Sequence, residues 1–287
     1  MFWTRLASGV VLMILALGGL GLGGMPLALL LWAVSLAGFR ELTRALQHRQ
    51  GETSSPGTVS GQEEGKPGFL EWIGFGGVTA YYLLLYFSGS HTALLLCVVG
   101  FFLAVMFAYV AAFPRYHGAQ AAAVVFSFLY APVLLSFVYQ TRMSPQGIYT
   151  VWMILISSWG CDTCAYVVGK LLGKKKIFPV LSPKKSLEGC IGGVLGAGLI
   201  GWLYGFFFVG KAFPEAGLGT AWAAMLICGA GAVMSMAGDL AASGIKRDNG
   251  IKDYGKLIPG HGGIMDRFDS MIVTAPMTYM LALLMLQ

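Results

Sequence analysis

The sequence predicts an all-α protein that crosses a membrane about nine times. Three observations support this fold class: 56% of the 287 residues are hydrophobic, the mean hydropathy is +0.72, and long apolar runs recur along the chain. A helix needs about 20 apolar residues to cross a hydrocarbon core of ~30 Å. Because backbone polar groups must be satisfied internally in lipid, such runs are expected to be helices.

The apolar runs can be taken in order. The first two are joined through Gly23, Gly24, Met25 and Pro26, and the second is short, so a re-entrant hairpin is an alternative for this pair. The side of the membrane that holds the N-terminus stays open for the same reason. The nine runs cover residues 3–22, 26–39, 69–87, 92–113, 121–140, 148–168, 189–209, 218–242 and 270–286.

Composition also divides the chain into four expected parts. The second part, residues 49–68, is a Gly/Ser/Glu-rich tract that cannot bury enough apolar surface to fold, and it is expected to be a mobile linker. The fourth part, residues 141–287, contains all the aspartates and is the expected catalytic domain. In the third part, residues 69–140, Glu71 is the only acid. The parts are an N-terminal helical pair with a cytoplasmic extension (1–48), the linker (49–68), a transmembrane scaffold (69–140) and the catalytic domain (141–287), which has cytoplasmic loops at 169–188 and 243–269.

The distribution of basic residues predicts the orientation of the chain. Sixteen of the 19 Lys and Arg residues lie in the connections after the second, fourth, sixth and eighth runs, and the exceptions are Arg5, Arg142 and Lys211. Basic loops face the cytoplasm in membrane proteins, so these connections are expected to be cytoplasmic. The net charge of +6 therefore reflects topology, and no nucleic-acid-binding module is visible.

Two acids fall within apolar runs, and both need compensation. Asp162 and Asp239 lie within or at the end of predicted spans, where an ionised side chain costs about 2.5–3.5 kcal/mol. A Lys or Arg partner, a proton or a bound cation could offset that cost. Cys161 and Cys164 form a CxxC pair around Asp162, but one such pair is weak evidence for zinc, and packing in a helix is favoured.

The most charged stretch of the chain is residues 243–269, which hold five basic and four acidic side chains. Asp266 and Asp269 are three residues apart, so a helix beginning here would place both carboxylates on one face. Mg²⁺ is commonly held by one or two carboxylates together with substrate phosphates. Acids beside many Lys and Arg side chains therefore indicate a site for Mg²⁺ and a polyphosphate.

Simpler interpretations of the same residues stay open. Asp266 could be the N-cap of the last helix, which its residue type supports as well as metal ligation. Lys174, Lys175 and Lys176 are better explained as topology signals, whereas Lys184 and Lys185 are not. His261 could be a loop residue fixed by hydrogen bonds, because a phosphate nucleophile is already ionised near neutral pH and needs no general base.

Residues 243–269 resemble the signature of the phosphatidate cytidylyltransferases. So many matching positions over 27 residues make the resemblance highly specific, and it extends upstream over roughly the C-terminal half of the chain. The first 140 residues resemble the family only in hydropathy. The matching positions are Ser243, Lys246, Arg247, Lys252, Asp253, Gly255, Ile258, Pro259, His261, Gly262, Gly263, Asp266, Arg267, Phe268 and Asp269, with Ser158, Asp162, Ala165, Tyr166, Gly169, residues 182–189, Gly238 and Asp239 upstream.

The resemblance implies an integral membrane nucleotidyltransferase of phospholipid biosynthesis. Such an enzyme transfers CMP from CTP to phosphatidic acid with Mg²⁺, with a second cation left open, and works as a homodimer, here expected in a bacterial inner membrane. Asp239, Asp266 and Asp269 are the expected metal ligands. The expected catalytic residues are Lys246, Arg247, Lys252, Arg267 and His261, and the expected substrate-binding residues are Asp162, Lys184, Lys185, Ser243, Gly262 and Gly263.

Two other functions fit part of this pattern. A CTP-dependent lipid-alcohol kinase would use the same nucleotide but would transfer only phosphate, so the position of an isotopic label separates the two reactions. A cation-coupled transporter would use the intramembrane acids as ion sites. That function has no use for five basic residues in one loop, and the sequence shows no internal repeat.

Overall fold

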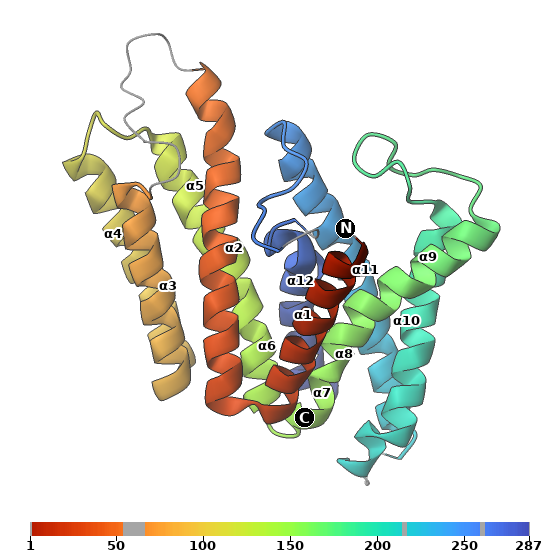
Figure 1. Ribbon diagram of the computed structural model, residues 1–287. Coiled ribbons are helices and arrows are strands. Elements are labelled where there is room, and N and C mark those ends of the chain that lie inside the picture. The colour runs from red at the N-terminus through yellow and green to blue at the C-terminus, as the bar shows by residue number, and fades with distance from the viewer. Residues whose placement is uncertain (1, 54–66, 214–216, 259–261, 287) are drawn as a thin grey trace. The chain divides into compact units, whose positions relative to one another are not determined.

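The computed structural model describes residues 2–53, 67–213, 217–258 and 262–286. Within these ranges every regular element is a helix, and the only β-structure is a pair of isolated bridges, Lys176 with Ser186 and Ile258 with Gly262. The all-α prediction is therefore confirmed (Figure 1).

The body of each of the nine predicted apolar runs is helical, although the runs 92–113, 218–242 and 270–286 extend one or two residues beyond their helices. Two of the runs are composite, because a π-helical turn interrupts each of them. The elements are α1 Phe2–Leu22, α2 Gly24–Thr53, α3 Phe69–Phe87, α4 His91–Ala111, α5 Gly118–Phe128, η1 Leu129–Val133, α6 Leu134–Met143, α7 Gly147–Thr150, α8 Trp152–Leu155, η2 Ile156–Gly160, α9 Cys161–Leu172, α10 Leu187–Phe207, η3 Val209–Lys211, α11 Gly219–Asp248 and α12 Met265–Met285.

Seven helical segments in the described parts of the chain are long and apolar enough to cross a membrane. The protein is therefore a polytopic helical membrane protein. The other two predicted runs correspond to α3 and to α1, whose apolar part spans Ser8–Leu22. The seven segments are Gly24–Gln47, His91–Ala111, Gly118–Met143, Gly147–Leu172, Leu187–Lys211, Gly219–Asp248 and Met265–Met285.

The helices form two compact units, and the chain passes between them three times. The first unit comprises Met1–Ser136 with Ile245–Asp266, and the second comprises Phe137–Gly244 with Arg267–Gln287. The passages within α11 and α12 divide the charged stretch 243–269, which we call the signature segment, between both units.

The first unit is held by aromatic packing and by buried hydroxyl pairs. The ring of Phe39 on α2 fills the space beside Gly74 on α3, where a Cβ atom would overlap it. Ser35 on α2 hydrogen-bonds to the hydroxyl of Tyr82 on α3 at 2.8 Å, and all of these side chains are buried or nearly so. These contacts fasten α2 to α3, as the adjacent ribbons in Figure 1 show.

The second unit is built around glycines on α10. A Cβ atom added to Gly193 would lie 3.0 Å from Sγ of Cys161, and one at Gly196 would lie 2.6 Å from Sγ of Cys164. Small residues at helical spacing let two membrane helices approach closely, so α9 packs tightly against α10. The two cysteines of the CxxC pair therefore serve packing, in agreement with the sequence interpretation.

Glycines on α11 allow a second set of close contacts within the same unit. A Cβ atom at Gly231 would overlap Ser157 of η2, and one at Gly238 would lie 2.8 Å from the backbone oxygen of Asp269 on α12. The space beside the small residues of α11 is therefore filled by neighbouring helices. The close approach at Gly238 brings the turn of α12 that carries Asp269 against the part of α11 that carries Asp239.

Candidate active site

Asp162, Lys185 and Asp239 come together in the second unit. The ammonium group of Lys185 lies 2.5 Å from Oδ2 of Asp239, and Asp162 on α9 lies within electrostatic range of both. Lys185 thus provides the basic partner that an acid in an apolar helix requires. The side chains of Lys185 and Asp239 stay 20% and 30% exposed, although Nζ of Lys185 itself is buried. Asp239 is therefore the more accessible member of this acid–lysine cluster.

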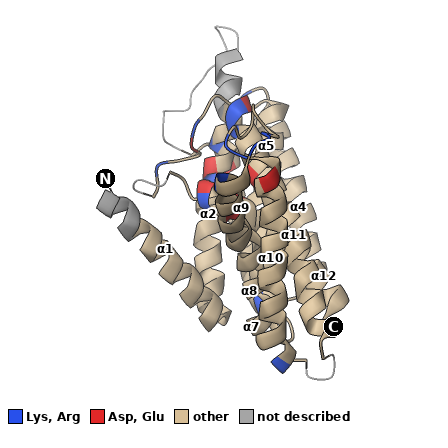
Figure 2. Cartoon of the chain, turned by 90° about the vertical axis from the view of Figure 1, so that its right-hand side faces the viewer, with Lys and Arg blue, Asp and Glu red and all other residues tan. Residues whose placement is uncertain are grey.

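The connection between α9 and α10 places Lys185. Glu188, the only charged residue of α10, accepts hydrogen bonds from the backbone N–H groups of Lys174 at 3.0 Å and Lys175 at 3.3 Å. Lys176 donates to the backbone oxygen of Lys184 at 2.9 Å, so the connection is folded back on itself. The side chain of Lys184 is exposed, and the rest of α10 is uncharged, as Figure 2 shows.

Asp266 organises the signature segment within the first unit. Its Oδ1 accepts from Nζ of Lys246 at 2.8 Å, and its Oδ2 accepts from the backbone N–H groups of Tyr254 at 2.9 Å and Gly263 at 3.0 Å. The side chain is only 4% exposed. Asp266 is the second residue of α12 and not its N-cap, so the N-cap alternative is wrong in detail, although the carboxylate does satisfy a backbone N–H group ahead of the helix.

Lys246 is engaged on two sides. Besides its ion pair with Asp266, its ammonium group lies 5.4 Å from the centre of the Tyr254 ring, within the range of a cation–π interaction. An ammonium group has three donors, so contact with Asp266 still leaves donors for a phosphate.

Asp269 lies in the second unit, at the start of the part of α12 that packs against α11. It is buried, and its Oδ1 accepts from the backbone N–H and the hydroxyl of Ser270 at 2.7 and 3.3 Å. Since Gly238 packs on the backbone of Asp269, the contact between α11 and α12 brings Asp239 and Asp269 onto neighbouring turns of two helices.

The carboxylates suit a hard divalent cation by their chemistry, since Mg²⁺ prefers oxygen ligands. Within the described residues, no three His, Cys, Asp or Glu side chains are gathered closely enough to form a protein-only metal site. Mg²⁺ characteristically takes one or two carboxylates and completes its shell with water and substrate phosphates. Asp239, Asp266 and Asp269 each offer carboxylate oxygens of this kind, and each already has a partner: Lys185 for Asp239, Lys246 and two backbone N–H groups for Asp266, and Ser270 for Asp269.

The other predicted site residues are distributed as follows. Arg247, Lys252 and Arg267 are exposed, and Ser243 is half-buried on α11. Gly262 has a φ of +87°, a conformation that residues with a Cβ rarely adopt. His261 lies outside the described residues.

One charged residue of this region was not identified from the sequence. Glu41 on α2 is 9% exposed, and its Oε2 accepts from the backbone N–H of Met265, the first residue of α12, at 2.9 Å. The sequence contained a weak signal, since Glu41 and Arg40 directly follow the short apolar run 26–39. That signal indicated the end of an apolar helix, but it did not indicate that Glu41 contacts the start of α12.

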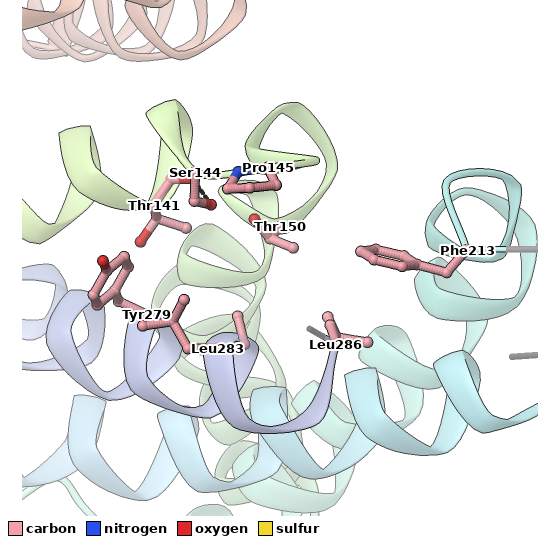
Figure 3. Close-up of a pocket in the computed structure, with 9 residues that line it drawn as sticks. Thr141, Ser144, Pro145, Thr150, Phe213, Tyr279, Leu283 and Leu286 are labelled. Atoms are coloured by element: carbon pink, nitrogen blue, oxygen red, sulfur yellow. Dashed lines mark hydrogen bonds between the residues drawn. The ribbon is translucent and has the colours of Figure 1, made fainter.

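The second unit also has a small pocket at the opposite end of α12 from Asp269. The space, which opens to solvent, measures about 240 Å³. Figure 3 shows Tyr279 and Leu283 of α12, together with Leu286 just after the helix, facing Thr141 and Thr150 across it. The helix rise of 1.5 Å per residue separates Leu283 from Asp269 by roughly 20 Å. The pocket is therefore remote from the predicted site residues of this unit.

Comparison with known proteins assigns the chain to a family. The sequence model of the Cytidylyltransferase family matches residues 3–285. The phosphatidate cytidylyltransferase of Staphylococcus haemolyticus (strain JCSC1435) is 36% identical over 171 residues, which are 60% of this chain and 62% of that protein. The phosphatidate cytidylyltransferase of Staphylococcus aureus (strain COL) is 37% identical over 166 residues, which are 57% of this chain and 59% of that protein.

These alignments span about three fifths of the length of the curated relatives. The family match, in contrast, runs from the first predicted span to the last and includes the whole signature segment. The chain therefore belongs to the Cytidylyltransferase family.

Proposed function

We propose that this protein transfers CMP from CTP to phosphatidic acid and produces CDP-diacylglycerol and pyrophosphate. The family match and the names of the relatives support this activity. The observation that carries it is the acid–lysine cluster of Asp162, Lys185 and Asp239. Asp239, its third member, lies on α11, the helix that leads into the signature segment. A site of carboxylates and basic side chains in a membrane protein suits a lipid phosphate and a nucleotide.

The proposed reaction is a displacement at phosphorus. A phosphate oxygen of phosphatidic acid forms a bond to the α-phosphorus of CTP, and the bond from that phosphorus to the oxygen bridging to the β-phosphorus breaks. The bridging oxygen leaves with its electron pair as part of pyrophosphate, and nothing is oxidised or reduced. Both reactants are anions, so neutralising their charge is the main task of the residues around them.

The basic side chains divide this task. Arg247, Lys252 and Arg267 are exposed at the signature segment and are proposed to contact phosphates. Lys246 can do so with the donors that Asp266 does not use. Lys185 and Asp162 are proposed to bind the nucleotide or the lipid headgroup beside Asp239, and Lys184 is a further candidate from the same connection.

Asp239, Asp266 and Asp269 are the proposed ligands of Mg²⁺, since each offers carboxylate oxygens. Mg²⁺ when bound would neutralise and orient the triphosphate of CTP. The contribution of the chain itself is to hold Asp239 and Asp269 on two tightly packed helices, which keeps the two carboxylates fixed relative to each other.

We also propose a membrane setting for the reaction. The clustering of basic residues supports a site on the cytoplasmic side, and the bacterial relatives support an inner membrane. The homodimer rests on the family resemblance alone. Crosslinking of the full chain in native membranes tests it, with recovery of only monomer counting against it.

The activity can be tested with the full chain in nanodiscs that contain phosphatidic acid and Mg²⁺. CTP labelled at the α-phosphorus should transfer its label to lipid, whereas CTP labelled at the γ-phosphorus should release its label as pyrophosphate. A lipid alcohol that becomes labelled from the γ-position would instead identify a kinase. If neither label reaches lipid in a folded preparation, both reactions are rejected.

A further inference from the structure

The start of α12 is held by a residue from the distant N-terminal region. Glu41 lies on α2, and its Oε2 accepts from the buried backbone N–H of Met265 at 2.9 Å. The backbone of Ile264 hydrogen-bonds to the same carboxylate. The first N–H groups of a helix have no partner within it, and a carboxylate near this end also interacts favourably with the helix dipole. Glu41 therefore caps α12 from another helix.

Two glycines of the signature segment leave the space that Glu41 occupies. A Cβ atom added to Gly255 would lie 2.8 Å from Cδ of Glu41, and one added to Gly263 would lie 2.7 Å from the same atom. Both distances are shorter than real Cβ contacts, so neither site can hold a larger residue unless Glu41 moves. The family resemblance implies that Gly263 binds substrate, but the group beside it here is the carboxylate of Glu41.

Asp266 holds the same turn through different atoms. Its Oδ2 accepts from the backbone N–H groups of Tyr254 and Gly263, so Gly263 lies between Asp266 and Glu41. The two acids differ in how their charge is compensated: Asp266 is paired with Lys246, whereas Glu41 accepts from the backbone at the start of α12. A shift of Glu41 would release the start of α12 and with it the turn that Asp266 organises.

The surroundings of Glu41 do not suit a direct contact with substrate. The residue is 9% exposed, and its carboxylate faces backbone N–H groups and two glycines of the protein itself. We infer that Glu41 is a positioning residue, which acts through the start of α12 and Asp266 in the cytidylyl transfer proposed above. The N-terminal helices are on this account part of the active unit, although the sequence assigned function only to the later ones.

The test compares Glu41→Gln and Glu41→Ala with Glu71→Gln in the full chain. Glu71 is a matched control, because it is also a buried Glu of the first unit, and its charged neighbours are Arg40 and Arg44 on α2. Hydrogen exchange of the 254–266 segment and steady-state kinetics with CTP are measured in nanodiscs, and thermal unfolding shows which variants are folded. Gly263→Ala is a second way to displace the Glu41 carboxylate, because the added Cβ atom would overlap it. Gly76→Ala is its control, since the Cβ atom added there meets open space.

We expect exchange at Ile264 and Met265 to accelerate by about tenfold or more in the Glu41 variants, because their N–H groups lose an acceptor. kcat should fall by roughly 10–100-fold with a smaller change in the KM for CTP, since misplaced groups slow chemistry more than binding. Gly263→Ala should have the same two effects, and both controls should have neither.

Unchanged exchange in a folded Glu41→Gln variant would overturn the inference, as would faster exchange that leaves kcat at the wild-type value. A lower melting temperature without faster exchange of the segment would assign Glu41 to general stability and overturn it too. The hydrogen-exchange measurement does not depend on the proposed reaction. A wild-type protein that fails to label lipid would thus reject the proposed function, and with it the catalytic part of the inference, while exchange still reports whether Glu41 holds α12.

Discussion

The ammonium group of Lys185 lies 2.5 Å from Oδ2 of Asp239. The lysine comes from the basic connection that precedes α10, and the acid comes from the membrane-spanning helix α11. This pair compensates an acid in an apolar helix, and it does so without burying either side chain completely. The pair is therefore a structural contact, and it also includes an acid that is partly exposed. Each aspect leads to a prediction.

Removing the lysine should affect stability and activity together. In Lys185→Met, Asp239 loses its charged partner, and we expect a loss of about 1–3 kcal/mol in the free energy of unfolding. Transfer to lipid should also fall. Thermal unfolding in detergent and the labelled-CTP assay check both effects.

Lys174→Met is the matched control for this variant, since Lys174 is an exposed lysine of the same connection and its hydrogen bond to Glu188 is donated by the backbone N–H. It should match the wild type in both measurements. The double variant Lys185→Met/Asp239→Asn should recover part of the stability, because the unpaired charge is gone. A Lys185→Met protein as stable and active as the wild type would show that the pair has no role.

The proposed metal ligands should be sensitive to loss of a single charge. Asp239→Asn and Asp269→Asn keep the size of the side chain but weaken its affinity for Mg²⁺, so we expect transfer to fall by at least about 100-fold. The rate should be measured over a range of Mg²⁺ concentrations, and high Mg²⁺ should restore it in part. Asp248→Asn, which changes an exposed acid at the end of α11, is the control. Wild-type rates and Mg²⁺ dependence in both variants would eliminate these two ligands.

Lys246 should contribute to both binding and chemistry. Lys246→Gln removes the ion pair with Asp266 and the cation–π contact with Tyr254, so the signature segment loses a support as well as a positive charge. We expect kcat to fall by about 10–100-fold and the KM for CTP to rise. Lys256→Gln, an exposed lysine of the same segment, should have little effect on either constant. An increase in KM alone would mean that Lys246 only contacts phosphate.

The glycines of α10 should be required for packing of the second unit. A Cβ atom at Gly201 would lie 2.6 Å from Cβ of Cys228 and 2.8 Å from the backbone oxygen of Ala224, so Gly201→Ala forces α10 and α11 apart. We expect it to cost about 1–3 kcal/mol, measured by thermal unfolding in detergent. Gly229→Ala on α11 has open space for the added methyl group and should not destabilise the protein. Equal stability of the two variants would contradict the tight packing described here.

Much of the fold could be predicted from local sequence. The body of each predicted run, from 3–22 to 270–286, is helical, because hydropathy over about 20 residues reflects the bilayer and not the details of packing. Local sequence did not reveal the π-helical turns η1 and η2. η1 contains Pro132, whose backbone nitrogen cannot donate a hydrogen bond, whereas η2 contains no proline, and hydrophobic periodicity gave no sign of it.

The candidate site was predicted in its residue types but not in its pairings. Asp162, Asp239 and Lys185 were each singled out, yet the sequence did not indicate that they meet. Lys246 was predicted to contact phosphate, and its ion pair with Asp266 was not foreseen. Ion pairs between distant segments depend on which helix faces approach, and this information is absent from the charge pattern alone.

The sequence by itself determined that the chain is a polytopic helical membrane protein with one dense charged segment near its C-terminal end, because composition and hydropathy decide what can lie in lipid. Only the tertiary structure decided that Lys185 compensates Asp239 and that Glu41 caps α12, since both contacts join residues far apart in the chain. The physical reason is that a glycine such as Gly238 or Gly263 leaves space for a neighbouring group. The sequence shows where that space is, but it does not show which distant group fills it.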